Sequence, residues 1–298
     1  MDNLSQKFNE MIYLGADTSG FDSNRDNMRK LRKKEHQIIE DAALDNDLIE
    51  LKYLIEEQNA DINGCKDLIL QLSAKRGYLD IIKYLVEEHD ADIHCNDDYS
   101  LQWSAIEGRF EVVQYLIEHG ANVHADNDYP LRWAAIGGHL DVVRYLVDNG
   151  ADIHAKNDYA LQWSALKGHL HVVKYLVEHG ANVHSDNDYA VRWAAIMGHL
   201  DVTKYLISQG ADVHSNDDYA LRGSIEHGRI DVVKYLVEYG ANVHADEDFA
   251  LYYYVEKDNI EMLKYLIEHL MNTDGESVDT YKTEYGYLEV IMYLLNKL

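Results

Sequence analysis

The chain contains very little proline, cysteine and positive charge. Its 298 residues include one proline, Pro130, and two cysteines, Cys65 and Cys95. Two cysteines cannot form the disulfide framework of a small secreted domain, so we expect a reducing, intracellular compartment. No Gly/Ser-rich linker interrupts the chain either.

Lysine and arginine number 27 against 53 aspartates and glutamates, which gives a net charge of −26. Such an acidic protein is repelled by nucleic acids and by anionic membranes, so the expected partner is a protein of basic or mixed charge. No apolar run approaches the roughly 20 residues that cross a bilayer. The first residues, MDNLSQKFNEM, lack the apolar region of a secretory signal. We therefore expect a cytoplasmic protein.

Motifs of the common enzyme classes are also missing. The sequence has no P-loop, dinucleotide-binding fingerprint, HExxH motif, paired cysteine cluster or serine elbow. We expect no cofactor and no catalytic activity.

What the chain does contain is a phrase repeated every thirty residues. Residues 157–169 are NDYALQWSALKGH and residues 187–199 are NDYAVRWAAIMGH, with related versions at 96–109, 127–139 and 216–229. Histidines keep the same step: His94, His124, His154, His184, His214 and His244. A fixed period of this length predicts a repeat architecture.

Residues 158–187 illustrate the structure predicted for one unit. Asp158 is the expected N-cap of a first helix that ends at Gly168. A second helix, LHVVKYLVEH, is expected to end at Gly180 in the left-handed conformation. The unit is therefore helix, break, helix, turn.

The first helix is apolar on two sides. Bulky residues form one stripe, Tyr159, Trp163 and Leu166, and smaller ones form the other, Leu161, Ser164 and Ala165. A helix of this kind lies between neighbours, so bulky stripes are expected to pack against small ones. This places the tryptophans Trp103, Trp133, Trp163 and Trp193 in the core between repeats. The alternative is that they form a row of aromatic rings that binds a ligand. On the second helix, the side chains expected to point inward are Val172, Val173, Leu176 and Val177.

Two segments of the sequence resemble those of a known family. YPLRWAA at 129–135 resembles the TPLHxAA signature of ankyrin repeats, and GHLDVVRYLVDNGADIHA at 138–155 resembles the segment that follows it. The likeness covers residues 38–270 and 285–298. It implies an all-α, ankyrin-type solenoid of helix-turn-helix repeats.

The unit departs from the family in having thirty residues instead of thirty-three. The loss lies between His154 and Tyr159, so we expect shortened loops in place of full β-hairpins. The shortened form resembles the ankyrin arrays of giant DNA viruses, in which case the protein would act in a host cell.

The predicted organisation has three parts. Residues 1–36 are an N-terminal cap or tail, residues 37–271 a solenoid of about eight repeats, and residues 272–298 a capping half-repeat. Within the N-terminal part, a second interpretation of the basic segment 25–34 is a nuclear-import signal. We expect a monomer.

The resemblance implies that partners contact the turns and first helices. Positions near the end of the first helix vary between repeats, and arginines lie nearby: Glu107, Lys167, Met197, His227, Lys257, Arg132, Arg192 and Arg222. Acidic turns form a second candidate surface for a basic partner: Asp97, Asp126, Asp186, Asp217 and Asp246. A solvated edge is the alternative for these aspartates.

The histidines invite a metal hypothesis, but stacked helices lie about 8–10 Å apart, too far for equivalent histidines to share one ion. Hydrogen bonding within the turn is the alternative. Asn182 and His184 also resemble sites at which ankyrin repeats are hydroxylated.

A protein-interaction module is the predicted function. The alternative is an adaptor that uses residues 1–36 to deliver a captured protein to an enzyme machine such as a ubiquitin ligase.

Overall fold

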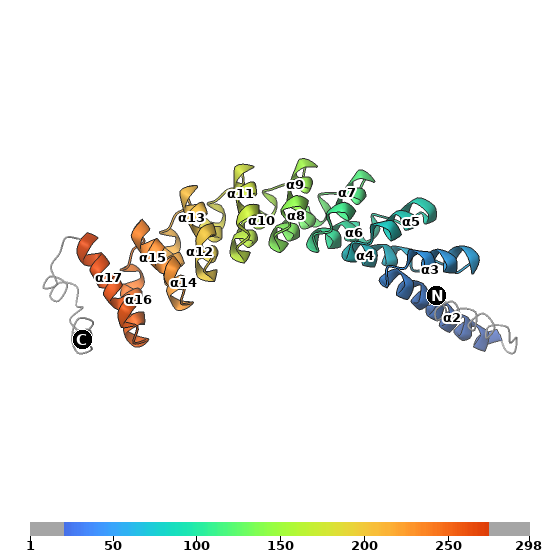
Figure 1. Ribbon diagram of the computed structural model, residues 1–298, viewed down its shortest axis with the longest axis horizontal. Helices are drawn as coiled ribbons and strands as arrows, with labels where there is room; N and C mark the ends of the chain where they lie inside the picture. The colour runs from blue at the N-terminus through green and yellow to red at the C-terminus, as the bar shows by residue number, and fades with distance from the viewer. Residues whose placement is uncertain (1–20, 274–298) are drawn as a thin grey trace. The chain divides into compact units, whose positions relative to one another are not determined.

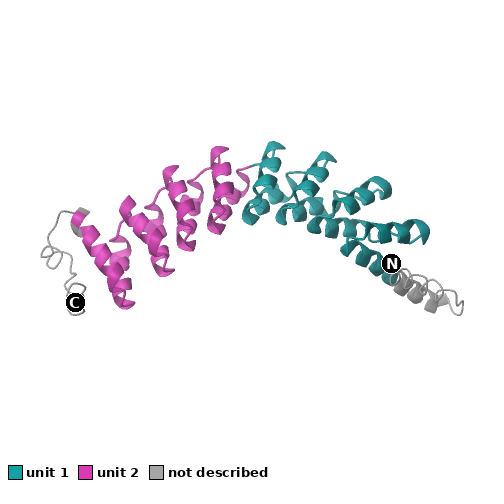
Figure 2. Ribbon diagram, viewed as in Figure 1, with its two compact units in different colours: residues 1–152 teal, residues 153–298 magenta. Residues whose placement is uncertain are grey.

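The computed structural model describes residues 21–273, and every element in that range is a helix. The predicted all-α fold is confirmed for these residues, which contain no strand where an ankyrin hairpin would project. The chain divides into two compact units, residues 1–152 and 153–298 (Figure 2). The predicted array, residues 37–271, includes parts of both.

Unit 1 begins with a long helix and continues as helix pairs (Figure 1). Its elements are α2 (Phe21–Leu44), α3 (Leu48–Lys52), the π-helical segment η1 (Tyr53–Glu57), α4 (Lys66–Arg76), α5 (Leu79–His89), α6 (Cys95–Ile106), α7 (Phe110–Glu118), α8 (Ala125–Gly137) and α9 (Leu140–Asp148). First helices contact first helices, α4 with α6 and α6 with α8, and second helices contact second helices. The result is two layers.

Unit 2 contains four further pairs in the same two layers. They are α10 (Ala155–Lys167) with α11 (Leu170–Glu178), α12 (Ser185–Met197) with α13 (Leu200–Ser208), α14 (Ser215–Glu226) with α15 (Ile230–Tyr239), and α16 (Ala245–Glu256) with α17 (Ile260–Thr273). Helices α10, α12, α14 and α16 form one layer and α11, α13, α15 and α17 the other.

The segments of the first two second helices have one extra residue before the turn, compared with the repeats that follow. In η1 the extra residue is accommodated by a wider turn, in which the Gln58 amide donates to the Tyr53 carbonyl five residues earlier. In α5 the helix extends to His89, and Asp90 adopts the left-handed conformation that glycine has in later repeats.

The core follows the predicted inner stripes. Leu161, Ser164 and Ala165 of α10 are buried, as are Val172, Val173 and Leu176 of α11. Lys174 and Glu178 are exposed on the outer side of α11. The inward-facing prediction is confirmed for these residues, whereas Val177 is only half-buried.

The prediction for the tryptophans is wrong in one respect. All four are half-buried, with part of each indole exposed. The small stripe and the second helices complete the close-packed layer, so only part of each large ring is covered. Where Gly223 replaces tryptophan, the gap is filled by Ile196 of the preceding first helix, which is fully buried.

Helix α2 continues across residue 36, where the sequence analysis places the start of the array. Which part of it acts as a cap stays a prediction. Residues 1–20 and 274–298, including nearly all of the predicted C-terminal half-repeat, lie outside the described residues.

Candidate protein-binding surface

A left-handed turn lies within the bounds given for each first helix from α6 onward, at the second to fourth residues of the element. Asp186, Asn187 and Asp188 have φ values of 54°, 53° and 57°, and the same three positions are left-handed in every one of these repeats. Asn and Asp tolerate this region better than other residues with side chains. The preference explains why four of the six turns have the sequence DND or NDD, the others being KND at 156–158 and DED at 246–248. The predicted right-handed helix therefore starts at the following tyrosine.

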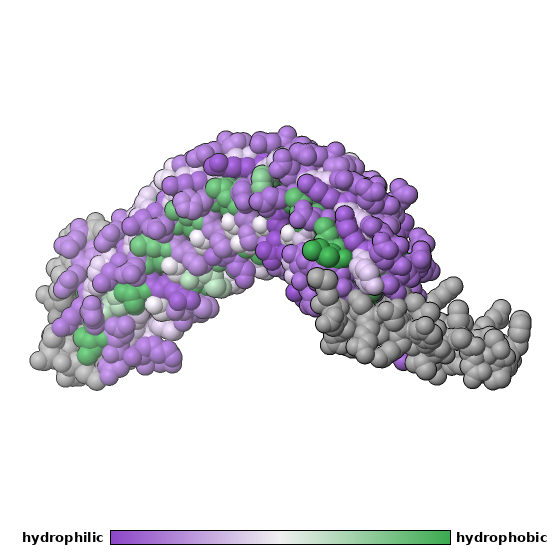
Figure 3. Space-filling view, turned by 45° about the vertical axis from the view of Figure 1, so that its right-hand side comes forward, coloured by the Kyte–Doolittle hydropathy of each residue, from purple (hydrophilic) through white to green (hydrophobic). Residues whose placement is uncertain are grey.

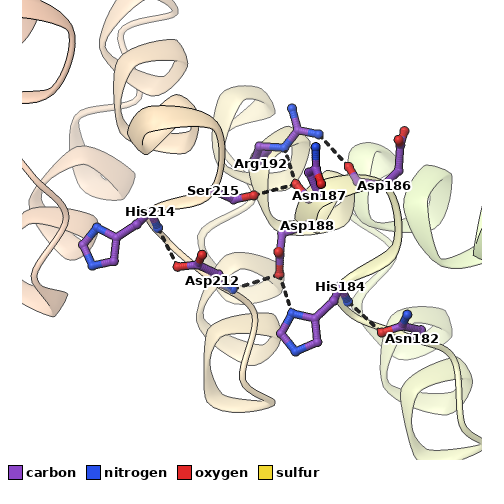
Figure 4. Close-up of polar contacts among 9 residues, drawn as sticks. All are labelled: Asn182, His184, Asp186, Asn187, Asp188, Arg192, Asp212, His214 and Ser215. Carbon is purple, nitrogen blue, oxygen red and sulfur yellow. Dashed lines mark hydrogen bonds and ion pairs between the residues drawn. The ribbon is translucent and has the colours of Figure 1, made fainter.

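The third residue of the turn is buried and connects two repeats. Asp188 is 6% exposed, and its Oδ1 accepts from His184 Nδ1 at 3.0 Å and from the Asp212 amide of the next turn at 2.9 Å (Figure 4). The prediction that the equivalent Asp158 is an N-cap is wrong, since its Oδ1 pairs with His154 and the Asn182 amide instead.

The same arrangement recurs along the chain. The His–Asp distance is 2.7–3.1 Å in all six pairs: His94–Asp98, His124–Asp128, His154–Asp158, His184–Asp188, His214–Asp218 and His244–Asp248. Hydrogen bonding within the turns thus explains why histidine recurs every thirty residues, and this was the alternative to metal binding. Among residues 21–273, no three His, Cys, Asp or Glu side chains are grouped to hold a metal.

Arginine fills the position that histidine occupies in the TPLH signature, and it holds the left-handed turn. Arg192 donates from Nε to the Asn187 carbonyl at 2.7 Å and from Nη2 to the Asp186 carbonyl at 2.8 Å. It is only 8% exposed. Arg132 makes the equivalent bonds, and Gln102 and Gln162 each make one of them. The altered signature therefore keeps a hydrogen-bonding role at this position.

These arginines also lie over tyrosine rings. The Arg192 guanidinium carbon is 5.7 Å from the ring centres of both Tyr189 and Tyr219. Arg222 is 5.6 Å from Tyr219 and donates to the Asp246 carboxylate at 2.6 Å. These two arginines are thus already engaged inside the molecule.

The acidic residues at the first or second position of the turns are different, because their carboxylates are exposed. Asp97, Asp126, Asp186 and Asp217 form no ion pair within residues 21–273. In Figure 4 the Asp186 side chain points away from the other side chains drawn. These aspartates are available to a partner, whereas Asp246 already pairs with Arg222.

Paired rings follow each turn on the first helix. Tyr189 contacts Trp193 four residues later, with ring centres 5.7 Å apart, and equivalent pairs join Tyr99 to Trp103, Tyr129 to Trp133, and Tyr159 to Trp163. Such spacings are favourable for aromatic pairs. Since tyrosine and tryptophan concentrate binding energy at interfaces, their partial exposure matters.

The predicted variable positions lie at the other end of the first helices. Lys167, His227 and Lys257 are exposed, while Glu107 and Met197 are half-buried. His227 Nδ1 is bonded to the Gly223 carbonyl at 2.9 Å. These residues and the acidic turns thus lie near opposite ends of one helix face.

Some tyrosines of the second helices donate a hydrogen bond to the preceding repeat. The Tyr115 hydroxyl donates to Glu87 of the preceding repeat at 3.1 Å. Burial, followed by the hydrogen bond and the negative charge of Glu87, raises the pKa of Tyr115 to about 12. Burial likewise raises the pKa of the Cys65 thiol to about 12.

Sequence reasoning missed two features of this surface. The connecting aspartates were detectable from the constant His-x-x-x-Asp spacing, which the N-cap interpretation obscured. The partial exposure of the tryptophans had a weaker signal, since the residues on the opposite side of the helix are small enough to complete the core alone.

The family comparison agrees with this geometry. The family model for ankyrin repeats (3 copies) matches residues 39–127, 70–157, 131–217 and 220–298. Comparison with curated proteins gives no significant match. No helix among residues 21–273 has both the length and the apolar character needed to cross a membrane. Ankyrin repeats are in general protein–protein interaction modules. The matched segments cover most of the sequence, and the chain therefore belongs to the ankyrin-repeat family.

Proposed function

We propose that this chain is a non-enzymatic module that holds one or more partner proteins on the face formed by its turns and first helices. The observation that carries the proposal is the partial exposure of paired tyrosine and tryptophan rings beside carboxylates that have no internal counterion. Rigid aromatic groups with a charged border are typical of protein interfaces.

The contact residues divide by position. Exposed turn carboxylates Asp97, Asp126, Asp186 and Asp217 would meet a basic partner, and Lys167, Met197, His227, Lys257 and Glu107 would select it at the other end of the helices. Arg132, Arg192, Arg222 and Asp246 would position the turns, given their internal bonds. A cytoplasmic location and a monomeric state fit this role and stay predictions.

Affinity capture followed by variant comparison tests the proposal. Tagged full-length protein would be compared with Asp97→Asn/Asp186→Asn and with Lys167→Ala/Lys257→Ala after capture from the native cell. We expect both variants to lose captured proteins while the helical signal in circular dichroism is unchanged. Undiminished capture by both variants would contradict the assignment of this face.

The adaptor role remains an alternative prediction. It depends on residues 1–36, of which residues 1–20 lie outside the described part of the chain. Deleting residues 1–36 would leave target capture intact and remove co-captured enzymes if the adaptor prediction is right.

A further inference from the structure

The face of α12, α14 and α16 in unit 2 presents aromatic rings that are partly uncovered. Tyr219 is 36% exposed and Tyr252 is 50% exposed, and Trp193 is half-buried. In the face shown in Figure 3, hydrophobic residues form separate patches among hydrophilic ones. A partner helix usually needs a continuous apolar groove. Separate patches favour a thin, extended partner instead.

The charges of this face select a cationic partner. Asp186, Asp217 and Glu247 are exposed and have no ion pair among the described residues. The two arginines of the face do not offset them at the surface, because Arg192 is buried against turn carbonyls and Arg222 is bonded to Asp246. Arginine suits such a site, since its guanidinium pairs with carboxylates and stacks on aromatic rings.

Repeat spacing sets the register of the partner. Packed helices lie about 8–10 Å apart. Each turn of this face contributes an exposed carboxylate from its first or second residue, so the carboxylates recur at about that interval. A polyproline II segment rises about 3.1 Å per residue and returns to the same side every third residue, which gives about 9 Å. One residue in three would therefore face each successive repeat.

We propose that α12, α14 and α16 bind an extended partner segment that carries arginine at every third position. This inference rests on the interaction function proposed above. The arginines would pair with the turn carboxylates, and their stems and the residues between them would cover the exposed rings. A protein segment of this pattern is the occupant for which the charge and the spacing are complementary.

Two peptides of identical composition test the register. The full-length protein would be titrated calorimetrically with four Arg-Ala-Pro units, and with an isomer that has its four arginines contiguous. We expect the spaced peptide to bind at least about fivefold more tightly, because only it reaches several carboxylates at once, each exposed pair contributing modestly. Raised salt should weaken its binding.

Matched variants test the face. Asp186→Asn/Asp217→Asn should weaken the spaced peptide about fivefold, and asparagine keeps the left-handed turn. Asp201→Asn/Asp231→Asn removes the same charge from exposed positions of α13 and α15 and should change affinity by less than about twofold. Trp193→Leu should weaken binding as well, with the helical signal checked by circular dichroism.

Equal affinity for both peptides, or equal weakening by both double variants, would overturn the inference and leave only general attraction between opposite charges. Absence of binding would also overturn it. The proposed function would survive either result if the capture experiment still depended on Asp97, Asp186, Lys167 or Lys257, so the two failures are distinguishable.

Discussion

At the scale of single residues, one buried aspartate per repeat connects successive turns. Asp188 accepts hydrogen bonds from both the His184 imidazole and the Asp212 amide, so its loss leaves a partly buried backbone donor without this acceptor. A shortened ankyrin unit lacks a hairpin between these turns. The aspartate supplies a link there with one side chain.

We predict that Asp188→Gly lowers the free energy of unfolding by about 1–3 kcal/mol, the usual cost of an unsatisfied buried group. Glycine retains the left-handed conformation, so the change isolates the side chain. Asn187→Gly is the matched control, since Asn187 has the same conformation and an exposed side chain, and it should cost little. The urea concentration at the midpoint of unfolding measures the loss of stability in each variant. Equal shifts would contradict the linking role of Asp188.

The raised pKa of Tyr115 leads us to predict that the protein loses stability at high pH. Burial and Glu87 raise its pKa from 10.0 to about 12, so the unfolded chain releases this proton at lower pH than the folded chain does. The contribution is therefore complete below pH 10 and is lost as pH rises towards about 12. Urea midpoints at pH 9 and 11 should fall less in Tyr115→Phe than in the wild type. The same fall in both proteins would refute this assignment.

At the scale of helices, a histidine just before a second helix bonds to the end of the first helix in the preceding repeat. Gly168 ends α10 with φ of +80°, and the His199 ring of the next repeat lies against it. His199 Nε2 donates to the Leu166 carbonyl at 2.9 Å, which satisfies an acceptor at the end of α10. Glycine is required for its conformation and for the close approach of the ring.

We predict that Gly168→Ala destabilises the protein more than Gly180→Ala does. Both glycines have positive φ, which costs alanine about 1–2 kcal/mol, but nothing lies within 4 Å of an added Cβ at Gly180. At Gly168 the added carbon would displace His199 and cost about 1 kcal/mol more. Unfolding midpoints of the two variants and of Gly168→Ala/His199→Ala test this. Additivity of the two changes in the double variant would argue against contact.

Helix type and the inward stripes were predictable from sequence, because both depend on local periodicity. Leu161 and Val172 needed only a period of 3.6 residues to be placed in the core. The left-handed turn was not predicted, since Asp158 satisfies the composition of an N-cap equally well. The burial of Arg192 depends on carbonyls that converge only once the turn exists, and partial exposure of Trp163 depends on the volume of neighbouring repeats.

At the scale of the whole chain, helices contact the helices next to them in the repeat order, such as α11 with α10 and α13. Stability in such arrays is approximately a sum of local and nearest-neighbour contributions, so damage should remain local. Leu176 is fully buried, and Leu176→Ala should cost about 2–5 kcal/mol within its own repeat.

We predict that Leu176→Ala accelerates amide hydrogen exchange in α10–α13 while α4–α7 keep their protection, because stability in such arrays is coupled mainly between neighbouring repeats. Exchange followed by mass spectrometry of peptic fragments measures this directly. Lys174→Ala, on the exposed side of the same helix, should change neither region. Uniform acceleration across residues 21–273 would mean that the chain unfolds as one cooperative body, and the binding face of unit 2 would then respond to damage anywhere in the array.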